Sequence, residues 1–235
     1  MSIWARISEF LTTVPANALS GVIEAVRTAL SGDPQLRRRV AFSIAMIALS
    51  AKMAKADGVV TQDEVRAFQQ IFIVPPEQTR NVARLFDLAK QDIAGFEAYA
   101  ERLAGLCGNG RPDCAMLEDI LDGLFHIAAD GVVHEREVGF LRRISEIFAI
   151  SEERFEIILS RHAVAGEADP WRVLGLELGA SFDEVKAQYR RMAAENHPDR
   201  LIARGVPEEF LAIANRRLAA INAAYETIER SRRPA

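Results

Sequence analysis

Apolar residues recur along this chain at helical spacing, and the alternating β-branched runs of half-buried strands are missing from it. One apolar stripe runs through residues 3–14 and ends at Pro15, and a second runs through residues 19–30 up to a Ser-Gly-Asp-Pro breaker. The charges of this segment cancel, so its polar face would bind a membrane surface weakly. We therefore favour docking of the segment on the rest of this chain or on a second copy. The pattern predicts an all-α protein that begins with an amphipathic helical segment over residues 1–35.

Two helices that the pattern predicts to be buried end in the same five residues. The stretch 40–54 is apolar nearly all round, as expected for a helix inside a bundle, and the second helix spans about 112–129. Each leads into Ala-Asp-Gly-Val-Val, at 56–60 and again at 129–133, and a Glu-Val pair follows each copy. A long buried helix, a tight turn and a shorter amphipathic helix therefore form an internal repeat.

The repeat resembles the TerB (tellurite-resistance) fold, a helical bundle with two such turns, over residues 36–162. TerB-like domains have been linked with metal binding. The candidate ligands here are four carboxylates, Asp57, Glu64, Asp130 and Glu137. They also have a simpler interpretation, because glycine suits a left-handed turn and Thr61-x-x-Glu64 is a capping box. Since acidic residues at calcium-loop spacing are missing, we expect no metal and no cofactor.

The C-terminal segment predicts two antiparallel helices, from residue 182 to about 195 and from residue 207 to about 228. Ser181-x-x-Glu184 is a capping box that opens the first of them. Matching apolar stripes let the pair close a small core, with a short helix around residues 171–174 laid across it.

The tripeptide His197-Pro198-Asp199 stands between these two helices. The helix before it carries three bases opposite its apolar stripe, namely Lys186, Arg190 and Arg191. The sequence VLG precedes the tripeptide at 173–175, and AAYETI follows it at 223–228. In this order the segment resembles a J domain, and most closely that of the DjlA-type co-chaperones. Members of that family join a TerB-like domain to a C-terminal J domain and share the unusually long loop at 197–207.

The resemblance implies that the tripeptide docks on a DnaK-type ATPase chaperone, while the basic helix face meets an acidic patch on that partner. Eight residues match the family's contact positions, namely His197, Pro198, Asp199, Tyr189, Lys186, Arg190, Arg191 and Arg200. Physically, Pro198 stiffens the turn, and Asp199 offers a carboxylate to an arginine of the partner. One position departs from the family, because Glu195 stands where many members carry a base.

These interpretations give an all-α fold with an N-terminal TerB-like helical bundle joined to a small antiparallel-helix J domain. The predicted parts are the N-terminal segment 1–35, the TerB-like domain 36–162, a linker 163–168 and the J domain 169–231. The expected function is stimulation of ATP hydrolysis and client capture by a DnaK-type chaperone, with the TerB-like domain giving localisation or regulation. The alternative is a stress-sensing or metal-sensing TerB-like module whose J-like segment only docks partners.

Composition narrows the expected partners. A net charge of −4 argues against a general nucleic-acid binder, and no histidine lies in a nucleophile pattern, so no enzyme is expected. The apolar stretches 10–23 and 40–51 are interrupted or too short to span a membrane, and no secretory signal is present. We therefore expect no membrane span and a cytoplasmic location, with Cys107 and Cys114 as reduced thiols. Besides the DnaK-type chaperone, an unknown protein partner of the TerB-like domain is expected, and a homodimer is left open.

Overall fold

The computed structural model describes residues 34–56, 74–91, 95–106, 114–128, 135–162 and 168–232. All regular structure in these stretches is helical, which confirms the predicted all-α class. The predicted N-terminal segment, apart from its last two residues, and both Asp-Gly turns lie outside the described residues. The predicted domain limits stay predictions.

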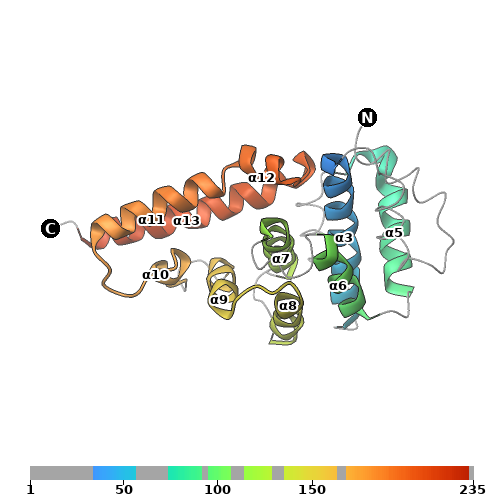
Figure 1. The fold of residues 1–235 in the computed structure, drawn as a ribbon, viewed down its shortest axis with the longest axis horizontal. Helices are drawn as coiled ribbons and strands as arrows, with labels where there is room; N and C mark the ends of the chain where they lie inside the picture. The colour runs from blue at the N-terminus through green and yellow to red at the C-terminus, as the bar shows by residue number, and fades with distance from the viewer. Residues whose placement is uncertain are drawn as a thin grey trace.

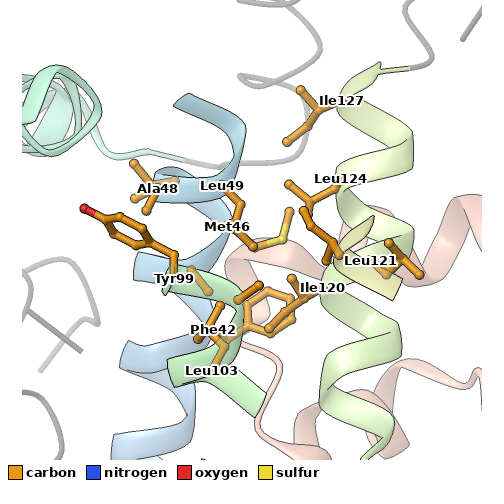
Figure 2. Close-up of a cluster of buried hydrophobic side chains, with 14 of the residues drawn as sticks. Phe42, Met46, Ala48, Leu49, Tyr99, Leu103, Ile120, Leu121, Leu124 and Ile127 are labelled. Atoms are coloured by element: carbon orange, nitrogen blue, oxygen red, sulfur yellow. The ribbon is translucent and has the colours of Figure 1, made fainter. Parts of the chain in front are cut away.

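The N-terminal bundle is organised around α3. Its described elements are α3 (Pro34–Ala56), the 3-10 helix η1 (Pro76–Gln78), α5 (Thr79–Gln91), α6 (Phe96–Leu106), α7 (Ala115–Ala128), α8 (Glu135–Ile147) and α9 (Glu152–Arg161). Helix α3 packs against α5, α6 and α7, and residues 40–54 are buried all round, as their composition predicts. Figure 2 shows side chains of α3, α6 and α7 meeting in this core, with Phe42 and Met46 on the α3 side. Burying a side chain of this size stabilises the fold by about 1.5–3 kcal/mol.

The cysteine prediction is wrong at Cys114. This residue lies directly before α7 and is disulfide-bonded, where the sequence analysis expects a reduced thiol. The expectation rested on the link between disulfides and oxidising compartments, which is a trend across proteins and does not decide a single cysteine. Cys107 lies outside the described residues.

The C-terminal part is a long helix pair that crosses the bundle. It contains α10 (Pro170–Val173), α11 (Phe182–Glu195), α12 (Pro198–Arg204), the 3-10 helix η2 (Glu208–Phe210) and α13 (Leu211–Ser231). Helices α11 and α13 run antiparallel, and their connection with α12 lies beside the bundle while the C-terminus lies at the opposite end of the pair (Figure 1). The predicted capping box is present, because Ser181 Oγ accepts from the Glu184 N–H at 3.3 Å and the Glu184 carboxylate accepts from the Ser181 N–H at 2.7 Å.

The predicted long loop after the tripeptide is largely a helix, and this differs from the sequence analysis. Residues 198–204 form α12, which ends because Gly205 adopts a left-handed conformation with φ of 102°. The helix predicted to begin at Pro207 consequently starts only at Leu211, after η2.

The two ends of this helix pair belong to different apolar clusters. The far end is α10 with the parts of α11 and α13 nearest to it, and its own cluster contains Val173, Leu174, Val185, Met192, Ile221, Ala224 and Ile228. The loop end is α12, η2 and the start of α13. Its buried residues Leu201, Val206, Phe210, Ile213 and Ala214 belong to the core of the bundle.

Close contacts of the backbone show how tightly the loop end is seated. A Cβ added at Gly123 of α7 would lie 2.8 Å from Ile213 Cδ1, and one at Gly205 would lie 2.8 Å from the Cβ of Arg38 on α3. The rings of Phe42 and Phe210 pack edge to face, with centroids 5.0 Å apart. The bundle and the loop end therefore share one core.

Candidate partner-binding site

The HPD tripeptide, His197-Pro198-Asp199, forms the exposed first turn of α12. His197 is the N-cap residue, and its Nδ1 accepts from the Asp199 backbone N–H at 3.3 Å. Pro198 takes the first helical position, where its missing N–H leaves no unpaired donor. The side chains of His197 and Asp199 are 58% and 86% exposed. The turn is thus fixed by the His197 side chain and the Pro198 ring, while the outer edge of the imidazole and the Asp199 carboxylate remain available to a protein partner.

The basic face beside the tripeptide is present but uneven. Arg190 and Arg191 are exposed on α11, and Arg200 is exposed on α12. The Lys186 ammonium lies over the Phe182 ring, 4.4 Å from its centroid, so part of its charge is already engaged. Glu195 is exposed at the end of α11 and interrupts the positive face before the tripeptide.

Tyr189 lies on the apolar stripe of α11 that the sequence predicts, so it packs inside the domain as well as matching a family contact position. Its ring stacks on Tyr225 with centroids 4.3 Å apart and planes at 22°, and both rings pack against the far-end cluster. Removal of Tyr189 would consequently disturb the α11–α13 packing as well as any contact with a partner. Its role as a contact residue stays a prediction.

A buried polar network behind the tripeptide was not predicted. Arg217 of α13 donates from Nη1 to both Asp119 Oδ1 and Asn196 Oδ1, and from Nε to Asp122 Oδ2, each at 2.8 Å. All four residues are at most 5% exposed. Asp119 and Asp122 belong to α7, while Asn196 directly precedes His197. The network therefore links the bundle to the residue next to the HPD tripeptide.

The electrostatics of this network follow from burial and pairing. Burial by itself raises the pKa of Asp122, but Arg217, His162 and Arg161 outweigh it and hold that pKa below its ordinary value. Burial likewise lowers the pKa of Arg217, and the two aspartates reverse this and raise it. Burial raises the pKa of Asp119 above its ordinary value, and the attraction of Arg217 and Arg204 only partly offsets this. The buried groups of the network therefore depend on one another.

The four metal candidates cannot be brought together from the described residues. Glu137 is buried in α8 at 4% exposure, and Asp57, Glu64 and Asp130 lie outside the described residues. Within the described stretches, no group of three or more histidine, cysteine or acidic residues could hold a metal ion. The alternative of a metal-sensing module stays a prediction.

Comparison with known proteins gives two matching family models. The model of the tellurite resistance protein TerB matches residues 43–160, and that of the DnaJ domain matches residues 169–234. Co-chaperone protein DjlA of Photobacterium profundum is 30% identical over 222 residues, which cover 83% of this chain and 79% of the relative. Co-chaperone protein DjlA of Coxiella burnetii is 31% identical over 202 residues, covering 77% and 73%. No solved structure matches this chain.

The expectation that the protein has no membrane span is wrong in the light of these relatives, because DjlA homologues are membrane-anchored co-chaperones. The expectation required a long apolar run without interruption. This criterion is too strict, because membrane helices tolerate glycine, proline and small polar residues. Among the described helices, none is long and apolar enough to cross a membrane. Residues 1–33 lie outside the described part.

Proposed function

We propose that this chain, which belongs to the DjlA family of J-domain co-chaperones, binds a DnaK-type chaperone. Through this contact it stimulates ATP hydrolysis and client capture by that partner. The family is not one of enzymes, so the residues of this site act by binding and not by transferring groups. The observation that carries the proposal is the exposed, N-capped HPD tripeptide at the end of a helix with exposed arginines.

The proposed stimulation is a matter of differential binding. A protein can shift its partner toward a hydrolysing state only if it binds that state more tightly than the resting state. Asp199 supplies a carboxylate that suits a bidentate arginine, and His197 offers an exposed ring edge beside it. Since the turn is fixed before binding, little conformational entropy is lost when the partner docks.

We propose that the TerB-like bundle regulates this activity by holding the tripeptide in place. The supporting observation is the contact chain from Asp119 and Asp122 through Arg217 to Asn196. A shift of α7 would be transmitted to the residue before His197, because charged groups in a buried network have few alternative partners. We also propose that the J domain works in the cytoplasm, since stimulated hydrolysis requires ATP.

The proposal is tested with His197→Gln and Asp199→Asn, each assayed for stimulation of a purified DnaK-type ATPase. Both variants should lose at least about tenfold of the stimulation, as expected when a charge-assisted contact is removed. Asp183→Asn is the matched control, because Asp183 is also an exposed aspartate in the first turn of a helix. Both Asp→Asn changes remove a negative charge that the helix dipole favours, so both variants should lose a similar small amount of stability. Asp183→Asn should nevertheless keep full stimulation. Full stimulation by folded Asp199→Asn and His197→Gln would refute the proposal.

A further inference from the structure

Arg204, in the last turn of α12, reaches back across the HPD tripeptide to the end of α11. Its Nη2 donates to the backbone carbonyl of Glu195, the last residue of α11. The two residues are nine positions apart in the chain, and the tripeptide lies between them. A base in the last turn of a helix commonly interacts with the carbonyls of its own helix or with water. Here the guanidinium instead connects the helix that ends before the tripeptide with the helix that begins at it.

The carbonyl that Arg204 binds is one for which α11 itself has no donor. The last four carbonyls of an α-helix lack an N–H partner within the helix. Asn196, the C-cap residue, supplies two donors, and both go to Met192 O: the backbone N–H at 3.0 Å and Nδ2 at 2.7 Å. The carbonyl of Glu195 accepts from Arg204. The end of α11 is therefore capped by a side chain of the next helix.

A second contact orients the Arg204 side chain toward the bundle. Its Nε lies 3.9 Å from Oδ2 of Asp119 on α7, whose side chain is 1% exposed. Both atoms are buried and have no hydrogen-bond partner among the described residues, so each is the other's nearest opposite charge without a bond of its own. Attraction between opposite charges is stronger away from water. Because the guanidinium is a planar fork, one nitrogen can face the carboxylate while another binds the carbonyl.

The backbone that carries Arg204 is itself held by the bundle. Leu201 is fully buried in the core of the bundle. Gly205 follows Arg204 in the left-handed conformation, and a Cβ added there would lie 2.8 Å from the Cβ of Arg38 on α3. Arg204 thus starts from a fixed position, so its bond to the Glu195 carbonyl sets the spacing between the end of α11 and the end of α12.

We propose that Arg204 is a positioning residue for the HPD turn. The assignment rests on the proposed function, because it concerns the turn that meets the DnaK-type chaperone. Arg217 holds the chain before the tripeptide through Asn196, and Arg204 holds the chain after it. A binding site that is correctly arranged for only a fraction of the time loses affinity by that fraction. Arg204 therefore acts on partner binding without touching the partner.

The test is a titration of a purified DnaK-type ATPase with the full chain, comparing the wild type with Arg204→Met. The concentration for half-maximal stimulation should rise by about tenfold, as expected when a charged hydrogen bond that orders the turn is lost. Maximal stimulation should stay at the wild-type value, because His197 and Asp199 are intact and a saturated partner selects the correctly arranged turn. A loss of overall stability would not give this split while urea unfolding shows that the variant remains folded.

Arg232→Met is the matched control. Arg232 is an exposed arginine of the same domain, and its Nη2 also donates to a backbone carbonyl of another element, that of Ala180. This bond lies at the far end of the helix pair. The control variant should consequently keep the wild-type half-maximal concentration.

Amide hydrogen exchange provides a readout without the chaperone. In the first turn of α12, the N–H groups of Arg200 and Leu201 donate to His197 O at 2.9 and 3.2 Å. Both amides should exchange about tenfold faster in Arg204→Met and at the wild-type rate in Arg232→Met. If Arg204→Met folds poorly, Arg204→Gln replaces it, because its shorter side chain is polar but cannot bring an N–H to the Glu195 carbonyl.

Three results in a folded Arg204 variant would overturn the proposal: an unchanged half-maximal concentration, wild-type exchange at Arg200 and Leu201, or effects no larger than those of Arg232→Met. If the wild type does not stimulate the ATPase at all, the proposed co-chaperone function fails. The exchange rates still decide, in that case, whether Arg204 orders the turn.

Discussion

The two ends of the J domain are stabilised by different neighbours. At the far end, α10, α11 and α13 enclose an apolar cluster made of their own residues. At the loop end, Leu201, Phe210 and Ile213 lie in the core of the bundle, and the charge of Arg217 is compensated by α7. The end that carries the HPD tripeptide therefore shares the core of the bundle. The far end also touches the bundle, because α10 packs on α9 and a Cβ added at Gly175 would lie 2.8 Å from Ile157 Cδ1, but its apolar cluster is separate. A change in the core of the bundle can thus reach the partner-binding turn directly.

Breaking the ionic link should have the largest effect on stability. Arg217→Met leaves the buried carboxylates of Asp119 and Asp122 without their main partner, which typically costs about 3–5 kcal/mol. Urea unfolding of the full chain measures this loss. Arg230→Met, an exposed arginine on the same helix, should change the free energy of unfolding by no more than about 0.5 kcal/mol. A loss below about 1 kcal/mol for Arg217→Met would mean that the loop end is not held by this network.

Apolar truncations at the two ends should differ in where they act. Phe210→Ala and Met192→Ala each remove a fully or almost fully buried side chain, with expected losses of about 3–5 and 2–5 kcal/mol. Because Phe210 packs on Phe42, the first variant should speed amide exchange in α3 and α7 as well as in α13. Met192→Ala should speed it in α10, α11 and the end of α13, which share its cluster, and not in α3 or α7. Equal exchange patterns for both variants would show that the two clusters unfold as one unit.

The sequence predicts the far end well and the loop end poorly, for a physical reason. Helices α7 and α11 follow from apolar periodicity, the start of α11 follows from the capping box at Ser181, and α3 follows from a stretch that is apolar nearly all round. These signals are local. Helix α12 has only seven residues, too few to establish a period, and its buried Leu201 packs against the bundle and not within its own domain.

The junction is missed because its interactions are long-range. Arg217 and Asp119 are 98 residues apart in the chain. The local sequence around each residue does not indicate its partner, so each is expected to be a solvated surface charge. A weak signal was nevertheless present. Asp119 and Asp122 interrupt the apolar run of a helix predicted to be buried, and Arg217 falls four residues before Ile221 on the apolar stripe of α13. Opposite charges at core positions of two helices indicate a buried pair that joins them.

Acidification should weaken the junction through His126. Its pKa is lowered from 6.5 to about 4 by burial, then by Arg216 and His162, so the unfolded chain takes up a proton over this range before the folded chain does. The free energy of unfolding should consequently fall as the pH drops from about 6.5 to 4, by at most about 3 kcal/mol. Asp122 faces His126 too, but its lowered pKa places its own titration below this window.

The measurement for this prediction is urea unfolding at several pH values with His126→Asn as the comparison. Asparagine cannot take up a proton, yet its side-chain oxygen can still accept from Arg216. The variant should therefore lose much of the pH dependence between 6.5 and 4. Identical slopes for both proteins would show that His126 does not titrate as its surroundings indicate.

The smallest effect on stability is expected on the outer face of α11, which neither cluster uses. Arg190 and Arg191 are exposed, so Arg190→Glu with Arg191→Glu should change the free energy of unfolding by no more than about 0.5 kcal/mol. Binding should respond differently. If this face meets an acidic surface on a DnaK-type partner, the double variant should slow association strongly at low salt and less at high salt, because exposed charges are screened. Glu195→Lys should act in the opposite direction by extending the positive face toward His197. Surface plasmon resonance at two ionic strengths measures both changes. Equal association rates of the wild type and the double variant at low salt would show that this face does not contribute to docking and that the HPD turn binds without it.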